Sequence, residues 1–245
     1  MTAPLFFTGP GALEGAGVGD VIRVLGDEAR HAAVVRRIGA GETVQVADGS
    51  GRVAVGEVVA AARDELTVRV AEIGESPVPA TRFVLMQALA KGGRDEQAVE
   101  SATELGVDGV VPWQAARSIV QWRGDKAEKA RRKWESLVLA ASKQSRRPTV
   151  PAVEPVVSGG GAVSRAGAAD ALIVLHEDAT RPLREVELPD AGEVLLVVGP
   201  EGGISPEELA AFEAAGGVTA RLGPTVLRAS SAGPAALAIL LAREW

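Results

Sequence analysis

The spacing of apolar and polar residues divides the chain into two regions. Over residues 1–73, short apolar segments end at glycine or Asp-Gly turns, which is typical of β-strands. From residue 81 onward, short apolar strands alternate with helical periodicity, which is typical of a parallel sheet. Residues 74–80 contain two prolines and a glycine and interrupt both patterns. The pattern therefore predicts a domain over 1–73, a linker over 74–80 and a second domain over 81–245.

The first region is predicted to form a small β-barrel. Short strands that surround a single helix are typical of such barrels. The strands are expected over 21–24, 43–46, 52–58 and 66–70, with a turn at 48–51 and a helix over 28–38.

The second region is predicted to have an α/β fold with a parallel sheet. Its strands are expected over 83–88, 109–112, 172–175, 195–198 and 218–222. Its helices are expected over 95–105, 126–144, 162–169 and 206–215, followed by a last apolar helix that Ser230 or Ser231 caps and that ends at Ala242.

The order of elements is clearest over residues 195–208. A buried strand leads into the loop Gly199-Pro200-Glu201-Gly202-Gly203, and Ser205-Pro206-Glu207-Glu208 has the form of a capping box that begins a helix. Ligands of open α/β sheets bind where strands end in such loops, and glycines allow a ligand to approach the backbone. A tight turn without a ligand would have the same spacing, so both interpretations stay open at this point.

Composition excludes several kinds of site. The 245 residues include no cysteine, which excludes disulfides, thiolate metal sites and a cysteine nucleophile. The chain has only two histidines, His31 and His176, so a histidine-rich metal site is not expected. The first residues lack the pattern of a signal peptide, and no apolar run reaches the roughly 20 residues of a membrane span. We therefore expect a soluble, cytoplasmic protein without a metal.

Charge is unevenly distributed along the chain. The net charge is −6, but residues 117–147 contain ten basic and three acidic residues. A basic face on an acidic protein can bind the phosphate backbone of a nucleic acid. The alternative interpretation is a solvated helix face.

Several nucleotide and hydrolase motifs are absent. The sequence contains neither a Walker-type phosphate loop nor Gly-x-Gly-x-x-Gly, and Glu201 would place a negative charge beside a pyrophosphate. A carboxylate at that position suits a ligand with an ammonium or sulfonium group, or it favours the helix dipole. No Gly-x-Ser-x-Gly motif supports hydrolase chemistry.

Several short segments together resemble one family, the small-subunit ribosomal RNA uridine-N3 methyltransferases (RsmE-type) of the trefoil-knotted SPOUT class. They occur in the family's order along nearly the whole chain: His31 with Val35-Arg36-Arg37, Asp48-Gly49-Ser50-Gly51, Thr103-Glu104-Leu105-Gly106-Val107, Arg117-Ser118, Gln144-Ser145-Arg146, Gly199 to Ser205, and Leu222-Gly223 with Val226-Leu227-Arg228.

The resemblance implies both a fold and an activity. It implies an amino-terminal PUA-like barrel for RNA and a carboxy-terminal SPOUT domain with a trefoil knot, which binds S-adenosylmethionine (SAM) and forms a homodimer. The implied reaction is SAM-dependent methylation of N3 of a specific uridine in 16S ribosomal RNA, free or in the small subunit, with no metal and no membrane. The alternatives are a ribose 2'-O-methyltransferase of the same class and a non-catalytic RNA-binding assembly factor.

The resemblance also implies roles for individual residues. Arg228 is expected to orient the uracil or stabilise its anion, and Glu201 or Glu177 to accept the N3 proton, because arginine cannot act as the base. The implied cofactor-binding residues are Leu175, His176, Glu177, Val198, Gly199, Pro200, Glu201, Gly202, Gly203, Leu222, Gly223, Val226, Leu227 and Arg228. The implied RNA-binding residues are His31, Arg36, Arg37, Lys91, Arg94, Arg117, Arg146 and Arg147.

Two positions depart from the family pattern. Family members often have Arg-Thr-Glu-Thr-Ala where this chain has Arg228-Ala229-Ser230-Ser231-Ala232, so an acidic residue is missing there. Ser101 replaces a lysine that often precedes Ala-Thr-Glu-Leu-Gly, and Lys91 or Arg94 is expected to take over an RNA contact.

Overall fold

The computed structural model describes residues 3–243, which form two compact units. The first unit runs to Val78 and also includes residues 142–150. The second unit contains residues 79–141 and everything from Pro151 onward. The boundary near residue 78 lies within the predicted linker. The return of the chain to the first unit over residues 142–150 was not expected from the sequence.

Residues 142–150 pack with the first unit through backbone and side-chain contacts. Thr149 forms β-bridges with Gly49 and Ser50. The Lys143 ammonium forms an ion pair with the Glu28 carboxylate. These contacts link positions about a hundred residues apart, so the periodicity of either segment alone gives no sign of them.

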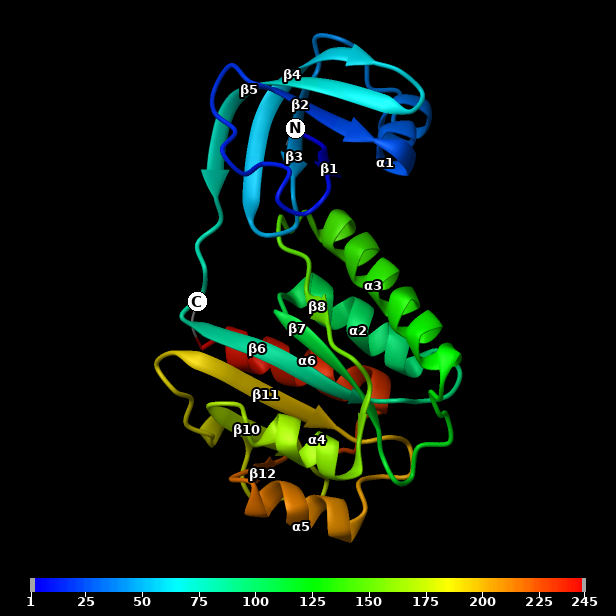
Figure 1. Ribbon diagram of the computed structural model, residues 1–245. Coiled ribbons are helices and arrows are strands. Elements are labelled where there is room, and N and C mark those ends of the chain that lie inside the picture. Colours follow the sequence, from blue (N-terminus) through cyan, green and yellow to red (C-terminus); the bar gives the residue numbers. More distant parts are fainter. Residues whose placement is uncertain (1–2, 244–245) are drawn as a thin grey trace. The chain divides into compact units, whose positions relative to one another are not determined.

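A curved five-stranded sheet forms most of the first unit (Figure 1). The order of its strands is β1-β3-β4-β5-β2, and alternate residues such as Val44, Val46 and Val68 fill its core. Its elements are β1 (Leu5–Phe7), β2 (Val21–Leu25), α1 (Gly26–Arg30), η1 (His31–Val35), β3 (Thr43–Ala47), β4 (Arg52–Ala61) and β5 (Glu65–Glu75).

The four strands expected in this region are confirmed. Strand β5 continues to Glu75, into the predicted linker, and β1 is too short to show a pattern in the sequence. The expected helix is the short α1 followed by η1, a π-helical segment in which the Arg36 amide donates to the His31 carbonyl (2.9 Å). Wider turns of this kind interrupt helical periodicity and are frequent at functional sites.

A parallel sheet covered on both faces forms the second unit (Figure 1). Its main strand order is β12-β10-β11-β6-β7-β8, and β9 also pairs with β7. Its elements are β6 (Thr81–Ala88), α2 (Arg94–Leu105), β7 (Gly109–Gln114), α3 (Asp125–Ser145), β8 (Ala152–Val153), β9 (Val157–Ser158), α4 (Gly159–Ala166), β10 (Ala171–Leu175), η2 (Leu183–Glu185), β11 (Gly192–Val198), α5 (Pro206–Ala214), β12 (Val218–Ala220) and α6 (Ala229–Leu241).

Both faces of this sheet are apolar, which explains why its strands have continuous apolar sequences. Val84 and Met86 of β6 point to the face that α4 and α5 cover, where Phe212 is buried. Helices α2 and α6 contact each other, and both contact β6, whose Leu85 meets Gly233 of α6. All five strands and five helices expected here are confirmed, whereas the two-residue strands β8 and β9 were not predicted.

The path of the chain after β12 bears on the implied knot. Backbone hydrogen bonds join Arg221 to Arg181 and Leu183, and α6 then contacts η2, which lies in the connection between β10 and β11. These contacts place α6 beside the 176–191 connection, through which the knot implied by the resemblance would thread it.

Candidate active site

Three adjacent parallel strands end at the same edge of the sheet. Strands β10, β11 and β12 end at Leu175, Val198 and Ala220, and the loops that follow them surround a pocket of about 410 Å³. Ligand pockets of α/β sheets form at this edge, and this volume falls within the usual range for small-molecule sites. The pocket lies at the three loops for which a ligand was predicted.

The loop after β11 has little room for side chains. A methyl group on Gly199 would lie 2.7 Å from Cγ1 of the buried Ile204, and Gly203 has a φ of +73°. Glycine is therefore required at the first position by space and favoured at the second by the backbone angle.

The predicted capping box at the start of α5 is confirmed. The Ser205 hydroxyl accepts a hydrogen bond from the Glu208 amide (3.2 Å), and the Glu208 carboxylate accepts one from the Ser205 amide (3.2 Å). The second Glu208 oxygen accepts from the Ala116 amide (2.7 Å), which ties the loop after β7 to the same helix start. Local sequence thus fixes where the glycine loop ends.

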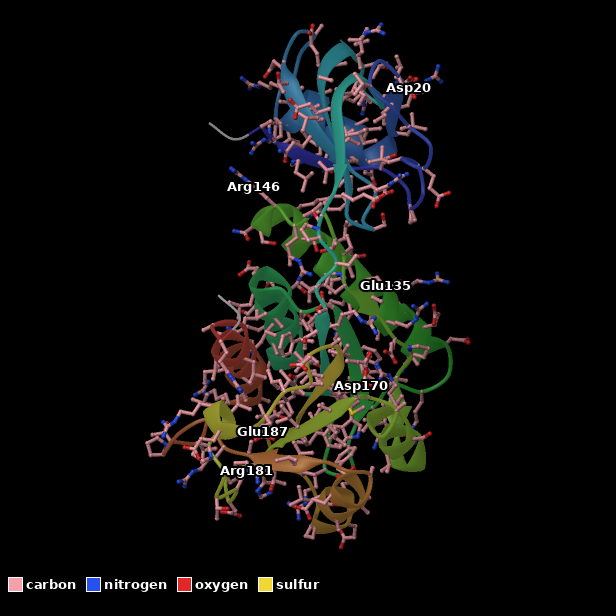
Figure 2. All side chains as sticks on the ribbon, turned by 90° about the vertical axis from the view of Figure 1, so that its left-hand side faces the viewer. Asp20, Glu135, Arg146, Asp170, Arg181 and Glu187 are labelled. Atoms are coloured by element: carbon pink, nitrogen blue, oxygen red, sulfur yellow. The ribbon has the colours of Figure 1, made fainter. Side chains whose placement is uncertain are left out.

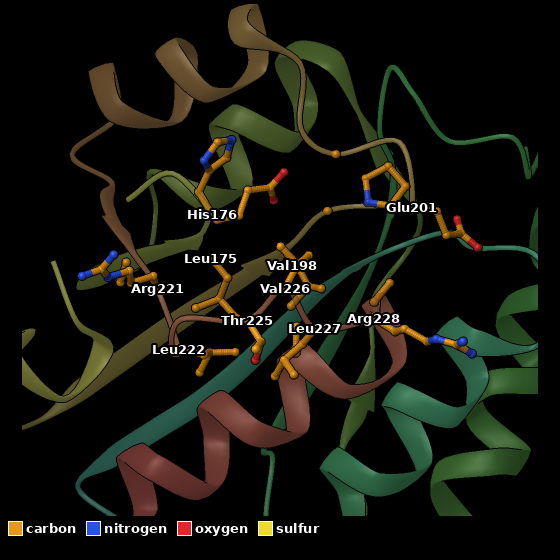
Figure 3. Close-up of a pocket in the computed structure, with 18 of the residues that line it drawn as sticks. Leu175, His176, Val198, Glu201, Arg221, Leu222, Thr225, Val226, Leu227 and Arg228 are labelled. Carbon is orange, nitrogen blue, oxygen red and sulfur yellow. The ribbon is translucent and has the colours of Figure 1, made fainter. Parts of the chain in front are cut away.

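Apolar side chains converge at the centre of the pocket (Figure 3). They are Leu175, Val198, Leu222, Val226 and Leu227. Val226 is 75% exposed and Leu227 is 38% exposed, so a ligand between them and Val198 would remove a large apolar surface from water. A flat aromatic group such as an adenine ring fits this lining.

Glu201 forms an ion pair at the pocket rather than standing free. The Arg94 guanidinium lies 2.9 Å from its carboxylate. Partial burial raises the pKa of Glu201, but hydrogen bonds from its own amide, from Arg94 and from the Lys91 backbone outweigh burial and keep that pKa below its ordinary range. Glu201 is consequently a stable carboxylate and a weak base.

The other charged groups of the pocket lie around its rim. Arg221 and Arg228 are exposed and point away from the apolar centre in Figure 3. Neither of them, nor Glu177, forms an ion pair within residues 3–243. The His176 Nδ1 accepts a hydrogen bond from the Asp178 amide (3.2 Å). In a neutral ring, this bond leaves the proton on Nε2. The rim thus offers two unpaired cations to an anionic group.

The structure brings together nearly all of the residues implied for the cofactor. Thirteen of the fourteen line the pocket; Gly202 lies in the same loop but faces Arg117. Sequence reasoning missed Arg94, which it assigned to RNA alone, and several residues of the last loop. Pro224 and Thr225 lie between predicted site residues, which was the available signal for them. Ala220, Arg221, Ala229 and Ala232 lie just before or after that predicted segment and also line the pocket.

The residues implied for RNA divide between the two units. Lys91, Arg94 and Arg117 belong to the second unit, where Arg117 donates to the Gly202 carbonyl (3.0 Å). His31, Arg36 and Arg37 are exposed in the first unit, as is Arg146, which projects from the ribbon in Figure 2; Arg147 belongs to the same unit and is half-buried.

Two arginines of the first unit adopt a left-handed backbone. Arg37 has a φ of +55° after η1, and Arg146 has a φ of +58° after α3. Glycine is the usual residue at such helix ends, and another residue there costs roughly 1 kcal/mol. An exposed arginine at each of these positions supports a role for its side chain in binding.

The basic segment 117–147 is partly neutralised by neighbouring acids. Arg131 pairs with Glu128 and Glu135, and Lys133 pairs with Glu96. The exposed Arg123, Lys126 and Lys129 have no ion pair in the described part of the chain. The segment therefore keeps a basic surface, although a smaller one than the sequence suggested.

Two kinds of feature are absent from the part of the chain that the structure describes. None of its helices is long and apolar enough to cross a membrane. No group of three or more histidine, aspartate or glutamate residues in that part is placed to hold a metal ion.

Comparisons with known proteins agree with this geometry. Residues 76–241 match the RNA methyltransferase domain family, and residues 24–71 match the RNA methyltransferase PUA domain family. Ribosomal RNA small subunit methyltransferase E of Mycobacterium bovis is 44% identical over 93% of this chain and 89% of its own length. The enzyme of the same name from Bacillus subtilis is 30% identical, over 85% of each chain.

A solved structure from Legionella pneumophila, in complex with SAM as its bound cofactor, has a TM-score of 0.87 at 25% identity and covers 99% of this chain and 98% of its own. The match to the RNA methyltransferase domain family, over residues 76–241, spans more than half of this chain and includes all three loops of the pocket. This chain therefore belongs to the RNA methyltransferase family, with an amino-terminal PUA domain.

Proposed function

We propose that this protein methylates N3 of a specific uridine in 16S ribosomal RNA, with SAM as the methyl donor. The observation that carries the proposal is the pocket at the carboxyl ends of β10, β11 and β12, with its apolar centre and two unpaired arginines at the rim. The names of the two relatives, both small-subunit ribosomal RNA methyltransferases, support the choice of RNA.

The pocket residues suit SAM. Leu222, Val226 and Leu227 would hold the adenine on apolar surfaces, and the backbone of the glycine loop would bind the polar edges of the nucleoside. When bound, SAM supplies an electrophilic methyl group on a sulfonium.

Arg228 is our proposed charge-stabilising residue. Uracil N3 must lose a weakly acidic proton before or during methylation, and the negative charge then spreads to the two carbonyl oxygens of the uracil. A preorganised cation beside those oxygens stabilises that charge. Arg228 lines the pocket and has no ion-pair partner within residues 3–243.

The two carboxylates of the pocket then have different roles. Glu201 is engaged by Arg94 and is a weak base, so we assign it to holding its loop rather than to proton transfer. Glu177 lines the pocket without an ion-pair partner among the described residues and is our proposed proton acceptor. The N3 edge is normally paired, so the target uridine has to be unpaired or flipped out.

We assign RNA backbone binding to arginines of both units. In the first unit these are the exposed Arg36, Arg37 and Arg146, together with Arg147, which follows Arg146; the PUA family match of this unit supports the assignment. In the second unit they are Arg94 and Arg117.

We further propose that the protein forms a homodimer through the second unit, where the apolar Ile119 is 69% exposed and would be covered by a second copy. We also propose that it acts in the cytoplasm. Light scattering on the purified protein tests the dimer.

Nucleoside mass spectrometry tests the reaction. The protein is incubated with unmodified small subunits, or with 16S ribosomal RNA, and SAM labelled on its methyl group. We expect labelled 3-methyluridine. Arg228→Met is expected to reduce the rate about 100-fold or more, because one charge-stabilising donor typically contributes that much.

Two outcomes would contradict the proposal. A ribose-methylated nucleoside would assign the protein to the 2'-O-methyltransferases of the same class. RNA binding without SAM binding or methyl transfer would indicate an assembly factor.

A further inference from the structure

Two arginines from outside the three pocket loops hold the glycine loop after β11 at consecutive residues. Arg94 pairs with the Glu201 side chain (2.9 Å), and Arg117 donates to the Gly202 carbonyl (3.0 Å). Arg94 begins α2, and Arg117 follows β7. The loop is thus restrained by segments that do not themselves surround the pocket centre.

The contact at Arg117 is close as well as polar. A methyl group on Gly202 would lie 3.2 Å from Cβ of Arg117, so the arginine stem packs directly against that glycine. The segment that carries Arg117 is itself fixed, because the Ala116 amide donates to Glu208 (2.7 Å) and the buried Ser118 hydroxyl donates to the Leu89 carbonyl (3.0 Å).

The backbone that carries Arg94 is also held in place. Asp95 is 5% exposed and accepts hydrogen bonds from the Ala90 amide (3.1 Å) and the Glu96 amide (2.9 Å). These bonds close the turn before α2 and set the position from which Arg94 extends. Arg94 also lines the pocket.

The glycine loop has few restraints of its own. Among the hydrogen bonds of the described residues, one backbone bond spans it, from the Gly203 amide to the Pro200 carbonyl (2.9 Å). Glycine-rich segments lose more conformational entropy on ordering than others do. External contacts that order this loop in advance therefore reduce the entropy lost when a ligand binds.

Each guanidinium has donors beyond the one that holds the loop. Arginine carries five N–H donors, and each of these two uses Nη1 for its loop contact. The Arg117 side chain is exposed, and that of Arg94 is 36% exposed. A phosphate or base oxygen of RNA can bind the remaining donors without breaking the loop contact.

We propose that Arg94 and Arg117 are positioning residues for the cofactor loop, and that RNA bound to them strengthens cofactor binding. The inference rests on the proposed function, since it takes SAM and RNA as the ligands. Coupling of this kind is reciprocal, so SAM has to strengthen RNA binding by the same factor.

Calorimetry with S-adenosylhomocysteine, which cannot transfer a methyl group, tests the positioning role. In the absence of RNA, Arg94→Met and Arg117→Met are each expected to weaken its binding about 10-fold. Arg117→Lys, which keeps one donor, is expected to recover part of the loss. The matched control is Arg82→Met, an exposed arginine on β6 outside the pocket lining, for which we expect no change.

Glu201→Gln removes the ion pair but keeps the charge of Arg94, so it shows which of the two matters for binding. Because both single variants remove the Arg94–Glu201 ion pair, the variant carrying both changes is expected to lose less affinity than the product of the two single losses. Independent, multiplying losses would contradict the pairing. Thermal unfolding of each variant reports whether it is folded, and this comparison uses the folded ones.

A fragment of unmodified small-subunit ribosomal RNA tests the coupling. We expect it to raise the affinity of the unaltered protein for S-adenosylhomocysteine several-fold and to have a smaller effect on Arg117→Met. Arginine variants that bind S-adenosylhomocysteine normally but RNA weakly would overturn the inference and leave the proposed function intact. Failure of the unaltered protein to bind S-adenosylhomocysteine would contradict the proposed function, and this inference with it.

Discussion

The two edges of the parallel sheet differ in how their charged side chains are paired. At the amino-terminal edge, Arg165 binds Glu154 with two hydrogen bonds (2.8 and 2.7 Å) and Glu193 with a third (2.6 Å). At the carboxyl-terminal edge, Arg221 and Arg228 form no ion pair within residues 3–243, and the loops are rich in glycine. One edge has its charges matched, and the other has cations exposed.

Backbone groups show the same difference. Asp170 accepts from the Glu193 amide (2.7 Å), and Asp108 accepts from the Phe83 amide (2.9 Å), so carboxylates secure strands at the amino-terminal edge. At the other edge, the Glu201 carboxylate secures a loop. The comparison shows that a single sheet can separate stability from ligand binding, because only one edge has to leave its polar groups available.

The largest effect on stability is expected from Arg165→Met. Glu154 and Glu193 have side chains that are only 32% and 16% exposed, and the change leaves both carboxylates without their cation. We expect unfolding free energy to fall by about 2 kcal/mol, which corresponds to a drop in Tm of about 4–8 °C. Denaturant and thermal unfolding measure the change.

Arg184→Met is the control for that substitution. Arg184 is 77% exposed and pairs with the exposed Glu185, so we expect a change below about 0.5 kcal/mol. If Arg165→Met weakened SAM binding in the folded protein, the two edges would not be independent, and the comparison would fail.

An intermediate effect, on SAM affinity, is expected when the pH is lowered and the ion pair of Glu201 at the carboxyl-terminal edge is lost. The pKa of Glu201 is lowered by its partners, so its ion pair is complete above the ordinary glutamate range and is lost as the pH falls through the lowered pKa. SAM affinity should therefore be level from neutral pH down to that range and fall below it. Glu201→Gln should bind more weakly at neutral pH and lack this acid-dependent step, and titrations at a series of pH values measure both.

The smallest effect is expected from Gly161→Ala in α4. A methyl group there meets no atom within 4 Å, and alanine favours a helix over glycine. We expect a gain of about 0.5 kcal/mol in unfolding free energy with no change in SAM binding. A loss of stability would show that the α4 side of the unit is packed more tightly than its contacts indicate.

Local patterns in the sequence predicted most of the fold. The α5 capping box depends on residues three positions apart. The longer strands follow from alternating apolar residues in the first unit and from the continuous apolar runs of a covered sheet in the second. The strands that were missed, β1, β8 and β9, have only two or three residues and carry no pattern of their own. Residues 31–35 were predicted as helix, but the π-helical form of η1 was not, because its wider turns do not follow the ordinary helical periodicity.

The pocket was predictable in its loops but not in its ion pairs. The three loops follow predicted strands, and that order places them at one edge. The Arg94–Glu201 pair joins residues 107 positions apart, and nothing in either segment indicates its partner. Sequence reasoning therefore gave Glu201 a role in proton transfer, for which its engaged carboxylate is poorly suited.

Residues 142–150 have a consequence for how this protein can be divided. The chain crosses between the two units three times, after residues 78, 141 and 150, so the first unit is not one continuous piece. A fragment that ended at Val78 would lack Thr149, which bridges to Gly49, and Lys143, which pairs with Glu28. The PUA unit therefore cannot be exchanged between proteins by a single cut and join, and recombination within this architecture has to carry the end of α3 along with it.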